Sequence, residues 1–233
     1  MAENSNLTPI YALADEFVTR YAALDPIAAT AMGVPGFEDQ LTDSSPEGIA
    51  ARDGLYREIG ARLAAAPVTN DRDRIARDAM DDVIALRLAR SEAGDPLREL
   101  SIISRAGPAG VRMVFDLMPR ATEADWQNIA TRLGGAPAAV AQFQRTLDEG
   151  IRRGLTAARR QVVANIQMVE TWSGAAGGES FFDRLVAGHA GNAALHADLE
   201  RAATAANASY ASYATYLKER YADVATEVDG VGR

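Results

Sequence analysis

Apolar positions recur with helical spacing along most of the chain, and short turn signals separate the segments that carry them. The signal Thr8-Pro9 predicts a helix start, because threonine can cap a helix and proline suits its first position. Asp25-Pro26 repeats the signal for a short helix that ends near Met32, and Ser45-Pro46 predicts a third, longer helix. Asn70 predicts the cap of a fourth. The positions expected to face the core in the first, third and fourth helices are Ile10, Leu13, Phe17, Tyr21 and Leu24, then Ile49, Leu55, Ile59 and Leu63, then Ile75, Ala79, Val83, Ile84 and Leu88.

The segment 25–43, "DPIAATAMGVPGFEDQLTD", interrupts this pattern early with two prolines and two glycines. It nevertheless carries apolar side chains, among them Ile27, Met32, Phe37 and Leu41. We interpret it as a structural corner in which proline and glycine fix a short helix and its exit. The apolar side chains are then expected to pin the following loop to the core.

The second half of the chain continues the helical pattern after an irregular stretch over residues 93–121, which predicts short helices and loops. Later signals are a Thr122/Asp125 capping box, a start at Ala136-Pro137, a break near Gly154 and a long helix from about residue 192 to 221. The glycine-rich segment 173–180 is a candidate flexible linker or lid. No alternating strand pattern is present. The sequence therefore predicts one all-α domain over residues 1–233, an irregular array of eight to ten helices with no significant sheet.

Composition agrees with a helical protein and excludes some partners. Hydrophobic residues make up 48% of the 233 residues and aromatic residues only 6%, with alanine filling the difference. The net charge of −8 argues against a nucleic-acid partner, because phosphate binding needs a basic surface. The chain has no cysteine, no basic start followed by an apolar run, and no apolar stretch of about 18 residues that could span a membrane. We expect a soluble, cytoplasmic protein that binds neither nucleic acid nor membrane.

Two histidines, His189 and His196, are the first place to look for a metal site. If both lay on one helix, seven residues would separate them by about 10.5 Å along the axis. Two ligands of one zinc ion cannot be so far apart. A loop at residues 188–191 could shorten the distance, but no HExxH motif exists. We expect two partly exposed histidines without a metal.

The acidic stretch "DRDRIARDAMDD" could suggest a magnesium site, but arginines alternate with its aspartates. Arg74 and Asp78 are four residues apart, as are Arg77 and Asp81, which is the spacing for side-chain pairing on a helix. A solvated, ion-paired helix face is the better interpretation. The aspartates concerned are Asp71, Asp73, Asp78, Asp81 and Asp82.

Two arginine pairs flank the expected break at Gly154. Arg152-Arg153 precede it and Arg159-Arg160 follow it, so these guanidinium groups could converge on an anion or a substrate carboxylate. The alternative is that they pair with carboxylates of the chain itself. Apart from these candidates, the sequence has no G-x-S-x-G, G-x-G-x-x-G or phosphate-loop motif, and no catalytic residue can be assigned.

The order of segments resembles a known bacterial family. The stretch "LADEFVTRYAALDPIAATAMGV", followed by "DQLTDSSPEG" and "RLAAAPVTNDRDRIARDAM", is similar to the opening of the family catalogued as domain of unknown function 885. Its members begin with a helix, a P-x-x-A-T-x-x-G segment and a D-x-L-x-D-x-S-P-E loop. Later features agree: Thr122, Gly150, Gly154 and the final "YLKERYADVATEVDGVG". The matching positions of the opening are Pro26, Ala29, Thr30 and Gly33, then Asp39, Leu41, Asp43, Ser45, Pro46 and Glu47.

The resemblance implies a protein about twice this long that is similar to zinc-dependent peptidases, with its histidine-glutamate metal motif in a C-terminal half. No position here matches that motif, so the resemblance supplies no catalytic, cofactor or metal residue, and zinc is implied only for the missing half. The chain is then the non-catalytic helical portion that shapes a substrate cleft. The alternative is a stand-alone helical interaction or small-ligand-binding module. The expected partner is the missing half, or a second copy bound through an exposed apolar patch on the helix 192–221 or beside Val224 and Val228.

Overall fold

A computed structural model describes residues 7–100 and 106–229. These residues form helices that turns and loops connect, with no strand among them. The all-α prediction is confirmed, and helices α1 to α10 agree with the expected eight to ten. None of the described helices is both long and apolar enough to cross a membrane. The helices are α1 (Pro9–Leu24), α2 (Pro26–Met32), α3 (Pro46–Ala65), α4 (Asp71–Glu92), η1 (Asp95–Arg98), α5 (Gly107–Leu117), α6 (Glu123–Gly134), α7 (Ala136–Arg152), α8 (Arg159–Ser173), α9 (Phe181–Ala187), α10 (Ala193–Tyr216), η2 (Leu217–Tyr221) and η3 (Ala222–Val224).

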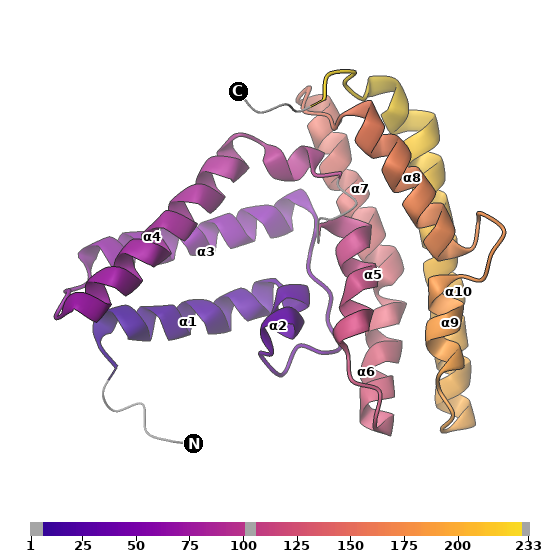
Figure 1. Cartoon of the computed structure of the whole chain (residues 1–233), viewed down its shortest axis with the longest axis horizontal. Coiled ribbons are helices and arrows are strands. Elements are labelled where there is room, and N and C mark those ends of the chain that lie inside the picture. Colours follow the sequence, from indigo (N-terminus) through magenta and orange to yellow (C-terminus); the bar gives the residue numbers. More distant parts are fainter. Residues whose placement is uncertain (1–6, 101–105, 230–233) are drawn as a thin grey trace.

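Helices α1, α3 and α4 form an elongated arm that projects from the rest of the molecule (Figure 1). They pack around a small apolar core in which Ile10, Ile59 and Leu63 are almost completely buried. The predicted starts are confirmed at Ser45, whose hydroxyl accepts from Gly48 N, and at Asn70, whose side chain accepts from Asp73 N. Thr8 precedes α1 but does not cap it, because its hydroxyl donates to Asp73 instead.

The outer edge of the arm carries a ring of four charged side chains that joins α1 to α3. Arg20 donates to both carboxylate oxygens of Glu58 at 2.6 Å, and Arg62 donates to both oxygens of Glu16 at 2.5 and 2.7 Å. The hydrogen bonds from Arg62 and Arg20 lower the pKa of Glu16 to about 2. Bidentate pairing of this kind fixes the register of the two helices.

Helix α4 turns a different face to the core than its sequence predicts. Ile75 and Val83, expected inside, are 61% and 52% exposed, and Ala79 is exposed as well. The buried face instead follows Asp73, Ala76, Met80, Ile84 and half-buried Leu88, and of these only Ile84 and Leu88 were predicted. The error arose because the two candidate stripes share the same helical spacing. Periodicity alone does not distinguish them.

Asp73 is the second correction on α4, because it is fully buried and not part of a solvated face. Its carboxylate accepts from Thr8 Oγ1 at 2.7 Å, Thr69 N at 2.9 Å and Thr69 Oγ1 at 2.6 Å. These hydrogen bonds, those from Thr69 first, lower its pKa. Elsewhere on this helix Arg74 lies 3.8 Å from Asp78, as predicted, but Arg77 pairs with Asp78 and not with Asp81.

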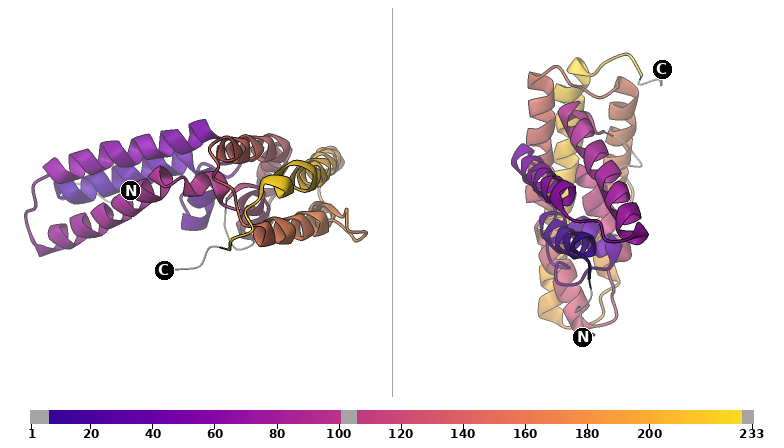
Figure 2. Two further views of the ribbon diagram at one scale, coloured as in Figure 1. Left: turned by 90° about the horizontal axis from the view of Figure 1, so that it is seen from above. Right: turned by 90° about the vertical axis from the view of Figure 1, so that its left-hand side faces the viewer.

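Helices α5 to α10 form the main bundle, beside which the arm lies (Figures 1 and 2). Helix α10 packs against α6, α7, α8 and α9, and several of its larger side chains are buried, including Leu199, Tyr210 and Tyr213. Trp126 and Trp172 belong to this core, as expected for apolar helix faces. The exposed large apolar side chains of the described residues include none from α10, whereas Val224 and Val228 are 44% and 73% exposed. Self-association through such a patch stays a prediction.

The later helix boundaries agree well with the sequence. Thr122 and Asp125 form the predicted capping box, and Gly154 adopts φ of +71° at the predicted break. The candidate linker 173–180 connects α8 to α9 through turns, and Ser180 caps α9. Its flexibility stays a prediction, as does the division of the chain into one domain. Residues 101–105 of the irregular stretch lie outside the described residues.

The corner 25–43 is held by one buried arginine. Asp25 caps α2 and Gly33 ends it with φ of +72°, as expected. Met32, however, is 50% exposed, so it does not pin the loop; Phe37 and Leu41 are only partly buried. Arg132 of α6, which is fully buried, holds the loop instead. Its guanidinium donates to Gln40 O at 2.8 Å, Phe37 O at 2.7 Å, Pro26 O at 3.3 Å and Thr30 Oγ1 at 3.0 Å.

Candidate ligand-binding cavity

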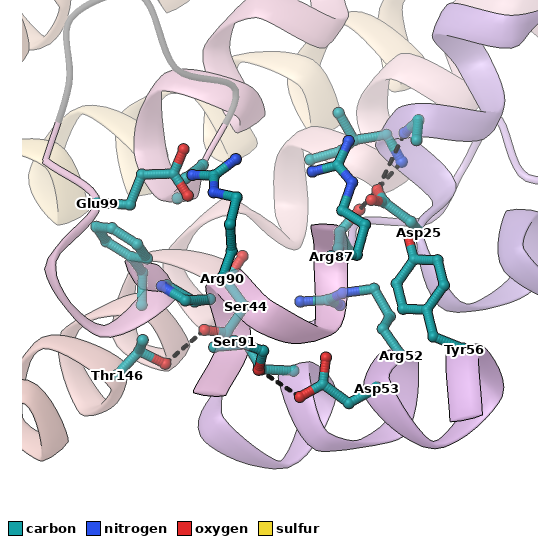
Figure 3. A pocket seen from close by; sticks show the side chains of 18 of the residues that line it. Asp25, Ser44, Arg52, Asp53, Tyr56, Arg87, Arg90, Ser91, Glu99 and Thr146 are labelled. Atoms are coloured by element: carbon teal, nitrogen blue, oxygen red, sulfur yellow. Dashed lines mark hydrogen bonds between the residues drawn. The ribbon is translucent and has the colours of Figure 1, made fainter. Parts of the chain in front are cut away.

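A cavity of about 420 Å³ lies where the arm meets the bundle. It opens between the end of α1, the corner segment, the ends of α3 and α4 that face the bundle, and the beginning of α5 (Figure 3). Its walls mix charged, hydroxyl and apolar side chains. The lining residues are Tyr21, Asp25, Ile27, Ala28, Thr42, Ser44, Ile49, Arg52, Asp53, Tyr56, Arg87, Arg90, Ser91, Pro96, Glu99, Ala106, Gly107, Phe143 and Thr146.

The carboxylates on one side of the cavity are held by neighbouring donors. Asp25 accepts from Thr42 Oγ1 at 2.6 Å, from Tyr21 OH at 3.0 Å and from Ala28 N at 3.0 Å. Burial, followed by the charge of Asp25, raises the pKa of the Tyr21 hydroxyl, so this hydroxyl stays a donor. Asp53 accepts from Ser91, which links α3 to the end of α4. These carboxylates belong to the wall and are not free ligands.

The guanidinium groups of three arginines surround the same space (Figure 3). Arg52 donates to Asp43 O at 2.8 Å, and Arg90 Nε lies 3.2 Å from Asp95 Oδ2. Arg87 has neither a hydrogen-bond nor an ion-pair partner within residues 7–100 and 106–229. Arg87 is an exposed residue at the edge of the cavity, and its guanidinium can pair with a carboxylate or phosphate through two parallel hydrogen bonds.

Apolar side chains line the same cavity. Ile27 is buried on the corner helix, and Phe143 is buried on α7. Thr146 of α7 donates to Ser44 O at 2.7 Å, which fastens the bundle to the start of α3 beside the cavity. The arrangement suits a small molecule or peptide segment with an anionic group and an apolar body, since such pockets combine apolar walls with a few placed polar groups.

The sequence-predicted arginines lie elsewhere and do not converge on one point. Arg152 and Arg153 both pair with Glu149, while Arg159 and Arg160 pair with Glu227 and Asp229 near the C-terminus. All four side chains are exposed. Arg160 lines a second cavity together with Asp229 and Arg98. An anion contact for the four stays a prediction, and it would have to compete with carboxylates already in place.

The histidines required the largest correction to the sequence-based geometry. Their Nδ1 atoms lie 3.3 Å apart, not about 10.5 Å along one helix, because α9 ends at Ala187 and α10 begins at Ala193. The loop between the helices reverses the chain and brings the rings together. His189 is also buried, contrary to expectation, whereas His196 is half-buried. Sequence spacing could not reveal this contact, since it depends on the course of the loop.

The part of the chain that the structure describes contains no group of three or more histidine, aspartate and glutamate side chains placed to hold a metal ion. The described residues therefore do not fit the catalytic zinc that the family resemblance implies. We derive no catalytic step from that ion.

Comparison with models of protein families identifies the family of the chain. The sequence model of the family described as "Bacterial protein of unknown function (DUF885)" matches residues 26–233. The chain belongs to the DUF885 family. A comparison with curated proteins found no match. The DUF885 match begins at the proline that opens α2, so α1 lies outside it although α1 packs on α3.

The structure gives the motif of the DUF885 resemblance a physical meaning. Pro26 O and Thr30 Oγ1 are partners of the buried Arg132, and Gly33 supplies the positive φ that ends α2. Ser45 caps α3, and its own N–H donates to Asp43 Oδ1 at 2.9 Å. The motif thus builds the corner that forms one wall of the cavity. Arg132 was missed from the sequence, where a fully buried arginine looks the same as an exposed one.

Proposed function

We propose that this DUF885 chain is the non-catalytic helical portion of a peptidase-like protein, and that the cavity between arm and bundle is part of its substrate cleft. The observation that supports the proposal is the Arg87 guanidinium, which has no hydrogen-bond or ion-pair partner among the described residues and lines the cavity together with Arg52 and apolar side chains. A peptide carboxylate would pair with this guanidinium, and a neighbouring apolar side chain would lie against Ile27 and Phe143.

The test is a binding measurement with a pool of short peptides that carry an apolar residue next to a free C-terminal carboxylate. We expect saturable binding to the full chain by calorimetry, and binding at least tenfold weaker for the same peptides with amidated C-termini. Arg87→Gln should cause a similar loss. Arg57→Gln is the matched control, because Arg57 is an exposed arginine of α3 that does not line the cavity.

The same peptides should remain uncleaved by the chain, with or without added zinc. Cleavage by the chain alone would contradict a non-catalytic role. Equal binding of the carboxylate and amidated pools would contradict the carboxylate site.

A stand-alone ligand-binding module is the second candidate. It would use the same cavity, whose charged, hydroxyl and apolar lining suits a small anionic molecule as well as a peptide. The downstream DNA separates the two candidates. A reading frame that continues into a histidine-glutamate metal motif supports the peptidase-like protein, and a stop codon without such a motif supports the module.

A further inference from the structure

The two histidines form a contact that the cavity does not involve, since neither lines it. The reversal between α9 and α10 holds His189 firmly. Its N–H donates to Val186 O at 3.0 Å, and its ring packs against the Trp126 ring at a centroid distance of 5.2 Å. A Cβ atom at position 191 would lie 2.8 Å from His189 Nε2, so any other residue there would push the ring out of its place.

His196 reaches the same point from the first turns of α10. Asn192 caps this helix by accepting from Ala194 N at 2.7 Å, and His196 N donates to Asn192 O at 2.9 Å. The two imidazole planes are nearly parallel, at 16°, and the Nδ1 atoms face each other at 3.3 Å. In the metal-free protein one Nδ1 carries a hydrogen and the other accepts it, since a hydrogen bond between two ring nitrogens requires one of each.

This separation also suits two ligands of one metal ion. Two nitrogens that each lie about 2.0–2.1 Å from a tetrahedral zinc ion are about 3.3–3.4 Å apart. Imidazole nitrogen is a good ligand for zinc, copper and nickel. No thiolate competes with the histidines for such a metal, because the chain has no cysteine.

A carboxylate supports His196 from the opposite side of its ring. Glu200 Oε1, one turn further along α10, lies 3.5 Å from His196 Nε2. A carboxylate beside the distal ring nitrogen keeps the hydrogen on that nitrogen and leaves the other lone pair free for a metal. At a metal site Glu200 would act as a positioning residue that favours the metal-binding tautomer of His196.

We propose that His189 and His196 form a two-histidine site that binds one divalent transition-metal ion through both Nδ1 atoms, with water molecules as the remaining ligands. On binding, the hydrogen between the rings moves to the Nε2 atom of the ring that carried it. Two protein ligands give a weaker site than the four of a structural zinc site.

Any metal binding through histidine must involve His189 or His196, because they are the only histidines of the chain. The full chain, with any histidine tag removed, is titrated with Zn²⁺ and with Cu²⁺ near neutral pH by calorimetry. We expect one ion per chain. His196→Gln, at the half-exposed position, should lower the affinity at least tenfold, and the double variant with His189→Gln should lose the site.

Glu200→Gln should lower the affinity about tenfold without removing the site, as found for carboxylates that orient metal-bound histidines. Asp198→Asn is the matched control, because Asp198 lies on the same helix but pairs with Arg201. Circular dichroism of every variant verifies the fold. Substoichiometric Cu²⁺ should broaden the ring proton signals of both histidines together in NMR spectra.

The inference is overturned if the wild-type chain binds neither ion saturably, or if the double variant binds as tightly as the wild type. Broadening of one histidine alone would also contradict it, because a single ligand does not make the proposed site. None of these outcomes depends on peptide binding, so this site and the proposed function can fail separately.

Discussion

The arm and the bundle both consist of packed helices, but they differ in the size of their apolar cores and in the polar contacts that support them. The bundle surrounds α10 with four helices and buries large aromatic side chains such as Phe182, Tyr210 and Tyr221 completely. The arm has three helices, a small core and an exposed outer face on α4. Hydrophobic burial is therefore the larger contribution in the bundle, while the arm adds polar contacts to its smaller core, among them the buried Asp73 and the partly exposed Glu16–Arg62 pair.

The two regions meet at the corner 25–43, and there one residue of the bundle organises a segment that leads into the arm. Burial lowers the pKa of Arg132 to about 10, so the guanidinium remains charged at neutral pH. Its charge is balanced by carbonyl dipoles of the loop and, at longer range, by Glu38 and Asp39. The corner is consequently a polar connection between two apolar cores.

Replacing Arg132 gives the largest expected effect. Arg132→Met removes the charge but leaves Pro26 O, Phe37 O and Gln40 O without their donor, so we expect a loss of about 4 kcal/mol in the free energy of unfolding. Relative to the wild type, backbone amide hydrogen exchange should become faster over residues 26–42, with a smaller change in α8 and α10. Arg145→Met is the control, since exposed Arg145 also joins bundle to arm, through Glu47, and should cost little. Equal losses for the two variants would show that Arg132 does not organise the corner.

Truncation of one leucine in each core tests whether the arm and the bundle unfold independently. Leu63→Ala in the arm and Leu199→Ala in the bundle each remove a completely or almost completely buried side chain, at a cost of about 3 kcal/mol. Both tryptophans, Trp126 and Trp172, lie in the bundle, so their fluorescence reports only on it. In urea we expect Leu63→Ala to lose circular dichroism before fluorescence changes. The two signals should stay together in Leu199→Ala, and coincident transitions in both variants would mean that arm and bundle unfold as one unit.

The sequence predicted helices better than it predicted which of their faces are buried. Proline and capping signals at Asp25, Ser45 and Thr122 are local, so their positions could be read directly and are confirmed. The buried face of α4 and the burial of Asp73 depend on neighbours distant in the chain, and both were misjudged. The same reason explains the candidate site. Arg87 and Arg52 come from different helices, and the contact of His189 with His196 depends on a loop, so no spacing rule could have predicted either one.

The smallest expected effect is that of acid on the ion pairs of the arm. The pKa of Glu16 is lowered from 4.5 to about 2, so its ion pairs stabilise the folded arm above pH 4.5 and lose this contribution as the pH falls toward 2. Glu16→Gln should therefore lower the arm's melting temperature at neutral pH, and the difference from the wild type should shrink as the pH falls from 4.5 and disappear only below pH 2. Circular dichroism melts at several pH values measure this.

Glu149→Gln is the matched control for the acid test. The pKa of Glu149 is also lowered to about 2, by Arg152 and then Arg153, but these partners lie at or just beyond the end of its own helix, α7. Its pairs therefore join no two helices, and its removal should leave the arm's melting temperature unchanged at every pH. If Glu149→Gln lowered that temperature as much as Glu16→Gln, the charge itself and not the connection between α1 and α3 would be responsible. The arm would then depend on surface charge in general, and its ion-pair ring would have no special role in holding α1 against α3.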